Sequence, residues 1–308
     1  MPLIHYATII LLGAIWGGSF VFIRVAAPAL GPFALVDARV LLAAAALGAW
    51  ALLSGERFDR AGVPLRRFLV LGAVNAAIPF SLIATAELVL PASLAAILNA
   101  TTPLLTALVA AVWLGERVTR QAIVGLALGA AGVMLVVGWS PLTLDPPTLL
   151  AVGASLLAAA CYAVGGVYAA RSLRGPRPTT LAFGQQLSAG VVLLAPATAT
   201  LPARPPTPET IFAVTLLATL CTAFAYVLYF RLIAAVGPTR TLSVTYLVPA
   251  FGVLWGGLAL GEAIGTGTVL GLVVILLGVW IVVGAHTRAK ESSDVSDRPA
   301  VSGEQTGE

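Results

Sequence analysis

The chain has 308 residues, of which 59% are hydrophobic and only 10% are charged, and its mean hydropathy is +0.99. Soluble domains carry about 25% charged residues, so this composition excludes a soluble globular protein and a fully disordered chain. The net charge of +4 lies mostly in short loops between apolar runs, which indicates control of membrane topology rather than binding of nucleic acid.

Apolar runs follow one another along the chain, each close to the ~20 residues that a helix needs to cross a bilayer. They are apolar all round rather than alternating, which favours helices over barrel strands. The first run has no Lys or Arg before it and is too long for a signal peptide, so we expect it to be retained. The ten predicted helices are 6–25, 33–53, 68–88, 92–114, 121–139, 148–170, 180–198, 210–231, 240–260 and 267–285.

Lys and Arg are distributed unequally over the two sides of this predicted bundle. When the loops are assigned alternately to the two sides, one side holds only Arg24 and Arg204, and Arg39 lies within the second helix. The rest of the 17 Lys and Arg residues lie on the other side. Cytoplasmic loops are enriched in these residues, so we expect both termini in the cytoplasm. The preference for Arg over Lys and the abundance of Ala suggest a bacterium with a GC-rich genome, and hence the inner (plasma) membrane.

The chain matches itself at an offset of 146 residues. Pro103 aligns with Pro249, and Leu114-Gly115-Glu116 aligns with Leu260-Gly261-Glu262. Each copy holds five predicted helices, and because five is odd the second copy enters the membrane from the opposite face. The sequence therefore predicts an all-α polytopic membrane protein of ten helices in two inverted repeats. The predicted domains are 1–140, 141–285 and a disordered cytoplasmic tail, 286–308.

The order of these motifs resembles the drug/metabolite transporter superfamily, with two EamA-type domains. The resemblance covers about residues 6–285, and rests on Trp16-Gly17-Gly18-Ser19-Phe20, on Arg39 and on the two aligned pairs of Pro and Leu-Gly-Glu. It implies an exporter-like fold in which helices 1, 3, 4, 6, 8 and 9 surround a central cavity. It names no substrate, because the family is broad.

Polar, aromatic and proline residues near the middles of the predicted helices are the candidates for a substrate cavity. Paired proline interruptions in corresponding helices point to a transporter site, because the backbone carbonyls that they free need partners. Packing kinks, hydrogen bonds between helices and aromatic belts are the alternative interpretation. The candidates are Trp16, Ser19, Asn75, Asn99, Thr102, Pro103, Tyr162, Tyr226, Thr245, Tyr246 and Pro249.

Charged residues inside the predicted helices are rare and expensive, so each needs a partner or water. We expect Arg39 to snorkel outward or to reach Glu87, near the outer end of the third helix. Glu87 is the carboxylate that we consider for proton coupling, with Arg39 as its partner. Glu116 and Glu262 lie at the ends of helices, where we expect them to be part of the helix-end and gate structure.

These features favour a secondary transporter that exports small organic metabolites, such as amino acids or drug-like compounds, by alternating access. A membrane-embedded enzyme and a channel are the alternatives. We expect no enzyme, cofactor or metal site, because the sequence lacks clustered acids, bases, nucleophiles and metal ligands. The expected partners are a small-molecule substrate and the lipid bilayer, and not nucleic acid. A homodimer remains an open alternative to a monomer.

Overall fold

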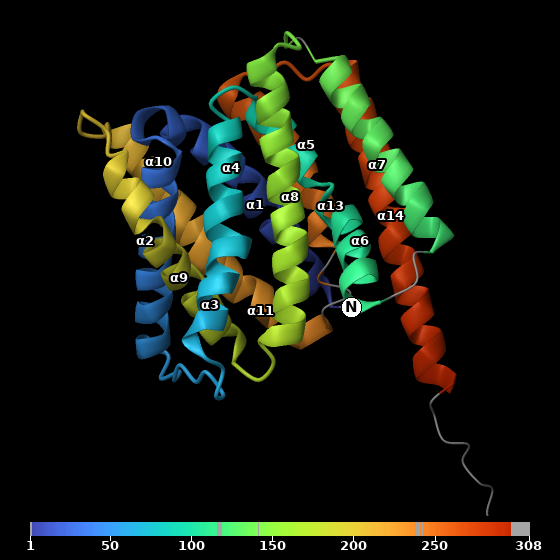
Figure 1. Cartoon of the computed structure of the whole chain (residues 1–308), viewed down its shortest axis with the longest axis horizontal. Helices are drawn as coiled ribbons and strands as arrows, with labels where there is room; N and C mark the ends of the chain where they lie inside the picture. The colour runs from blue at the N-terminus through green and yellow to red at the C-terminus, as the bar shows by residue number, and fades with distance from the viewer. Residues whose placement is uncertain (1, 116–118, 141, 238–240, 242, 297–308) are drawn as a thin grey trace, which may run out of the picture.

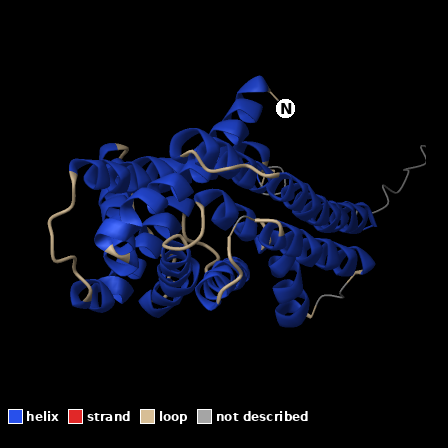
Figure 2. Cartoon of the chain, turned by 90° about the horizontal axis from the view of Figure 1, so that it is seen from above, coloured by secondary structure: helices blue, strands red, loops and turns tan. Residues whose placement is uncertain are grey.

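The computed structural model describes residues 2–115, 119–140, 142–237, 241 and 243–296, and in these residues the secondary structure is entirely helical. Figure 1 shows a bundle of long helices, and Figure 2 shows it from above, with loops joining the helices. Nine helices or groups of helices in the described residues are long and apolar enough to cross a membrane, and α13 is a shorter apolar helix. The predicted all-α membrane fold is therefore confirmed.

The ten spans are numbered in chain order, and three of them combine two or three helical elements. They are α1 (Leu3–Leu30), α2 (Pro32–Leu53), α3 (Leu65–Gly72) with η1 (Ala73–Ala77) and α4 (Ile78–Ala86), α5 (Ala92–Asn99) with α6 (Thr102–Leu114), α7 (Arg120–Gly138), α8 (Pro146–Ser172), α9 (Pro178–Ala199), α10 (Pro208–Ala218) with η2 (Thr219–Phe224) and α11 (Ala225–Val236), α13 (Val244–Leu260), and α14 (Thr266–Ser296).

Prolines and side-chain caps begin several of these helices. Pro at the first helical positions has a preset φ and sacrifices no hydrogen bond there, and α2, α8, α9 and α10 all begin this way. The Asp145 carboxylate accepts a hydrogen bond of 3.0 Å from the backbone N–H of Thr148 at the start of α8. The Thr207 hydroxyl accepts one from Thr210 at the start of α10. These caps satisfy backbone donors that helix ends leave unpaired.

The last helix is longer than the sequence predicts. A disordered tail was expected from residue 286, but α14 continues to Ser296. The segment Ala289-Lys290-Glu291 consists of good helix formers, which explains why the helix continues after the apolar run ends. The correction applies to residues 286–296, and the rest of the expected tail lies outside the described residues.

The two repeats share a local irregularity that the sequence did not reveal. A π-helical segment, η1, begins at Ala73 in span 3, and a second one, η2, begins at Thr219 in span 8. The repeat offset of 146 residues aligns these two starting positions. Single π turns inside α-helices are rare and occur frequently at functional sites. The shared π turns therefore support the equivalence of span 3 in the first repeat and span 8 in the second.

Span 4 is broken, whereas span 9 is continuous around its proline. The helix α5 ends at Asn99 and α6 begins at Thr102, with Pro103 in the first turn of α6. Pro249 lies inside α13. The sequence predicts a kink at both prolines, but at Pro103 the structure has a break between two helices instead. The break puts Pro103 in the first turn of α6, where a proline sacrifices no helical hydrogen bond.

Glycines let helices of the two repeats approach closely. The helices α7 and α14 lie side by side (Figure 1), and a Cβ atom at Gly132 would lie 2.9 Å from the carbonyl oxygen of Gly271. In the same way, a Cβ atom at Gly17 on α1 would lie 2.8 Å from the carbonyl oxygen of Val248 on α13. Small residues at such crossings are typical of membrane helices. The second crossing positions α13 beside the central cavity.

Candidate functional site

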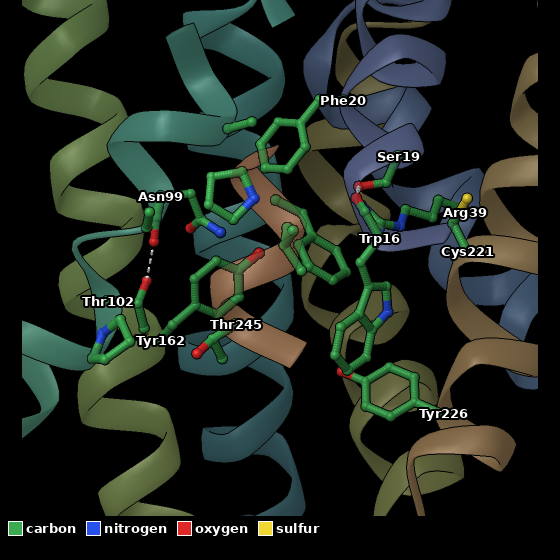
Figure 3. A pocket seen from close by; sticks show the side chains of 16 residues that line it. Trp16, Ser19, Phe20, Arg39, Asn99, Thr102, Tyr162, Cys221, Tyr226 and Thr245 are labelled. Atoms are coloured by element: carbon green, nitrogen blue, oxygen red, sulfur yellow. Dashed lines mark hydrogen bonds between the residues drawn. The ribbon is translucent and has the colours of Figure 1, made fainter. Parts of the chain in front are cut away.

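A cavity of about 290 Å³ lies between spans of both repeats. This volume is at the lower end of the range for small-molecule pockets. Side chains from the two repeats line it together, as Figure 3 shows. The lining residues are Trp16, Ser19, Phe20, Arg39, Phe80, Ala96, Asn99, Ala100, Thr102, Pro103, Tyr162, Cys221, Tyr226, Thr245, Val248 and Pro249.

Most of the residues that the sequence predicts for a cavity lie in this lining. Asn75 and Tyr246 are the two exceptions among the predicted cavity residues. The Tyr246 hydroxyl lies 3.4 Å from the carbonyl oxygen of Val279 and donates to it. Its ring packs against a cluster of buried apolar side chains around spans 4, 5, 6, 9 and 10. Tyr246 is therefore a packing residue of span 9 and not a cavity residue.

Asn75 belongs to a chain of hydrogen bonds between helices. Its side-chain amide donates to Gln185 Oε1 over 2.9 Å, and Gln185 in turn donates to the Tyr226 hydroxyl over 3.0 Å. A polar side chain among apolar helices needs such partners. Asn75 thus joins spans 3, 7 and 8 behind the cavity wall, and reaches the cavity only through Tyr226.

Aromatic rings form two walls of the cavity. On one side the centroid of Trp16 lies 6.4 Å from that of Tyr226 and 5.3 Å from that of Tyr229. On another side the rings of Phe80 and Tyr162 meet edge to face at 6.1 Å. Such edge-to-face and tilted pairs are favourable beyond the area that they bury. The cavity therefore offers flat, rigid apolar surfaces to a ligand.

Arg39 lies in the cavity wall rather than at the membrane surface. Its side chain is only 6% exposed, and its Nε donates to the Thr222 hydroxyl over 3.0 Å. Its guanidinium carbon lies 3.8 Å from the centroid of the Phe80 ring. The expected outward snorkelling of Arg39 is wrong, and so is its expected contact with Glu87. Thr222 in η2 and Phe80 in α4 are its partners instead.

Glu87, directly after span 3, is fully buried but does not line the cavity. Neither of its carboxylate oxygens has a hydrogen-bond partner among the described residues. Its backbone carbonyl accepts a hydrogen bond from Arg24. Burial raises the pKa of Glu87 well above its ordinary value, although the nearby Arg24 opposes this shift. The environment therefore favours a protonated Glu87.

Glu262 ties span 9 to span 4 at one end of the cavity. Its carboxylate accepts hydrogen bonds from the backbone N–H groups of Ala92, over 2.6 Å, and of Ser93, over 2.9 Å. A Cβ atom at Gly256 would lie 3.3 Å from Ser93 Cβ, and one at Gly252 would collide with the Cβ of Ala96. We call this contact between α5 and the second half of α13 the Glu262 closure. Glu116, the residue aligned with Glu262, lies outside the described residues.

The equivalent half of span 4 is packed less tightly than the half of span 9 that forms this closure. The repeat offset aligns Thr106 with Gly252 and Ala110 with Gly256. Gly252 and Gly256 are buried, whereas Thr106 and Ala110 are both partly exposed. Of these four positions, the two in span 9 are thus packed more tightly than their repeat mates in span 4.

Several lining residues were missed from the sequence, namely Phe20, Phe80, Ala96, Ala100, Cys221 and Val248. Most are apolar and give no chemical signal. Cys221 could have been found, because the repeat aligns it with the polar Asn75, and it lies in η2 beside Thr222, the partner of Arg39.

Known proteins resemble this chain in sequence and in fold. The sequence matches the EamA-like transporter family over residues 3–138 and 149–284. An uncharacterized transporter of Archaeoglobus fulgidus is 30% identical over 276 residues, covering 87% of this chain and 93% of that protein. The uncharacterized inner membrane transporter YedA of Escherichia coli K12 is 29% identical over 286 residues, which is 90% of each. A solved crystal structure with 21% identity covers 92% of this chain and 99% of its own, with a TM-score of 0.67, and shows the same fold. The chain belongs to the EamA-like transporter family.

Proposed function

We propose that this transporter is a secondary carrier that exports small organic metabolites from the cytoplasm by alternating access. The observation that carries the proposal is the unequal packing of equivalent helix halves around one central cavity. Gly252 and Gly256 are buried in the Glu262 closure, and their repeat mates Thr106 and Ala110 are partly exposed. In an inverted repeat, exchange of these two packings closes one end of the cavity and opens the other.

The proposed orientation in the inner membrane follows from the basic residues. Enrichment of Arg in the loop from Arg57 to Arg67 supports a cytoplasmic location for that loop and for both termini. The same assignment puts the Glu262 closure at the outer face. The cavity would then be closed to the outside and able to accept a solute from the cytoplasm, which suits an exporter.

Energy for transport can come from a proton gradient through Glu87. A buried carboxyl group with no hydrogen-bond partner among the described residues is expected to hold its proton. Glu87 lies five residues before Ala92 in the chain, and the backbone N–H of Ala92 donates to Glu262 in the closure. Opening of the closure would hydrate Glu87 and let it take up a proton from outside, and release of that proton to the cytoplasm in exchange for the solute would supply the energy.

Counterflow in liposomes tests the carrier mechanism. Purified protein should exchange a labelled metabolite against the same unlabelled compound without steady conductance and without chemical change of the solute. Continuous conductance would indicate a channel, and product formation an enzyme. Absence of exchange for a broad panel of metabolites would contradict the proposal.

Two glycine substitutions test whether the closure is part of the cycle. Gly252→Ala adds a Cβ atom that collides with Ala96, whereas a Cβ atom at Gly153 on α8 would meet nothing within 4 Å. We expect Gly252→Ala to slow counterflow severalfold and Gly153→Ala to leave it unchanged.

Labelling of single cysteines with an impermeant thiol reagent in intact cells tests the orientation. Labelling in the Arg57–Arg67 loop from outside would contradict it.

A further inference from the structure

We propose that the cavity selects organic monoanions, in particular flat aromatic carboxylates, which bind the guanidinium group of Arg39. The inference rests on the proposed function, because it names the class of solute that the carrier would move. Its starting observation is a buried arginine that lines the cavity and has no acidic partner in the described lining.

Protein partners satisfy only part of the Arg39 side chain. Thr222 accepts from Nε, and the Phe80 ring covers one face of the guanidinium. Neither terminal nitrogen has a hydrogen-bond partner among the residues that the structure describes. An arginine presents its donors as a planar fork that fits the two oxygens of a carboxylate. A buried positive charge without a counterion is costly, so a carboxylate ligand would complete this site.

The nearby acidic residues do not supply that counterion. Asp37 is also on α2, but its Oδ1 atom lies on the side of α9, 3.6 Å from where a Cβ atom at Gly190 would be. Glu87 is buried outside the cavity lining. Arg39 is thus the one ionic side chain in the described lining, and the cavity holds no carboxylate that could receive an ammonium group. This charge balance favours anions over cations and over zwitterionic amino acids.

The shape of the cavity restricts the body of the ligand. Trp16, Phe80 and Tyr162 contribute flat apolar surfaces, and Phe80 contacts both Arg39 and Tyr162. An aromatic carboxylate can therefore bind Arg39 with its charged end while its ring lies along the aromatic walls. Figure 3 shows Arg39 and Ser19 on one side of the cavity, and Tyr162, Asn99 and Thr102 on the other. The volume of about 290 Å³ suits one or two fused rings rather than a lipid or a peptide.

Three probes of similar shape and different charge test the selection. We would titrate 2-naphthoate, 2-naphthamide and 2-naphthamidinium into the purified full-length protein by calorimetry. Charge-assisted hydrogen bonds predict that naphthoate binds about tenfold to a hundredfold more tightly than the amide, with the amidinium weakest. Equal binding of the three probes, tighter binding of the amidinium, or no binding of naphthoate would overturn the inference.

Substitutions then connect the selection to Arg39. Arg39→Gln should bring naphthoate to the affinity of the amide, and Arg39→Lys should keep part of the preference, because lysine retains the charge without the fork. Arg231→Gln is the matched control, since Arg231 is exposed and lies over Trp50, 5.2 Å from the ring centroid. If Arg39→Gln does not fold, the lysine variant decides. An unchanged preference for naphthoate in the folded Arg39 variants would overturn the inference.

Counterflow of the same three probes separates this inference from the proposed function. Exchange of the amide or the amidinium, but not of naphthoate, would leave a carrier and refute the selection of anions. Tight, Arg39-dependent binding of naphthoate without exchange of any probe would support the selection and contradict the carrier mechanism.

Discussion

Glu262, in the loop after span 9, accepts a hydrogen bond of 2.9 Å from the backbone N–H of Ser93 in the first turn of span 4. The two residues lie 169 positions apart in the chain and belong to different repeats. The carboxylate satisfies N–H groups that the start of a helix leaves unpaired, and its negative charge suits the positive end of the helix dipole. This contact therefore holds the two repeats together at one end of the cavity.

Replacing Glu262 with Gln should weaken this closure. The amide keeps one acceptor oxygen but loses the second acceptor and the charge, at a cost of about 1 kcal/mol, or roughly a fivefold shift toward the opened state. We would measure labelling of Ser19→Cys by an impermeant thiol reagent from outside, in a variant without Cys161 and Cys221. Labelling should be faster in Glu262→Gln and unchanged in Glu209→Gln, in the first turn of α10. Slower labelling in Glu262→Gln would contradict the closing role.

We expect Asn75 to have a structural role and Asn99 to have a role in ligand binding, and substitution of each by alanine distinguishes the two roles. Asn75→Ala leaves the buried Oε1 atom of Gln185 without its donor, which costs about 1–3 kcal/mol of stability. Asn99 lines the cavity, and its Oδ1 atom has no hydrogen-bond partner among the described residues. Asn99→Ala should therefore cost less stability and change ligand affinity more. Thermal unfolding in detergent and calorimetric titration would measure both effects, and a lower melting temperature for Asn99→Ala than for Asn75→Ala would contradict this assignment.

Removal of the ionisable group at position 87 should change how stability depends on pH. The pKa of Glu87 is raised by burial, so the folded protein binds its proton more tightly than the unfolded chain does. The contribution of Glu87 to stability is thus fully present below the ordinary Glu pKa and is lost as pH rises through the raised value. We expect the melting temperature of wild type to fall by a few degrees over this window, and Glu87→Gln to remove that part of the decrease.

The groups near Glu87 that could obscure this effect are Arg24, Glu262 and Arg39. Each of them remains in Glu87→Gln, so subtraction of the two pH profiles isolates position 87. The same variant should still exchange solute but lose accumulation driven by a proton gradient. Identical pH profiles for wild type and Glu87→Gln would show that Glu87 does not titrate in this range.

The sequence predicted the helices well because the apolar runs and the basic loops are strong signals along the chain. The paired prolines also led to the cavity, since Pro103 and Pro249 both line it. The partners of Arg39 could not be predicted, because Thr222 is 183 residues away and faces Arg39 only through the η2 turn. A π turn depends on local backbone geometry, and the sequence of Ala73–Ala77 has no pattern that predicts one. Asn75 was misplaced for the same reason, as its partner Gln185 lies on another helix.

The paired prolines should control which end of the cavity is open. Pro103 begins α6 after the break in span 4, whereas Pro249 lies within the continuous α13. Pro103→Ala would let α5 and α6 join into one helix, and Pro249→Ala would restore a hydrogen bond inside α13, which straightens it. Inversion of the repeats exchanges the positions of these two spans, so we expect the two variants to favour opposite states of the carrier and both to slow exchange several fold.

Cysteines placed at the two mouths of the cavity would report this bias through their rates of labelling from each side of the membrane. Pro196→Ala is the matched control, because Pro196 lies inside α9 and does not line the cavity. Its exchange rate and labelling pattern should remain close to those of wild type. If Pro103→Ala and Pro249→Ala shift labelling toward the same mouth, or if both transport normally, the prolines act only in packing. The proposed role of Pro103 and Pro249 in the change of state would then be wrong, while the cavity and the position of Arg39 in it would be unaffected.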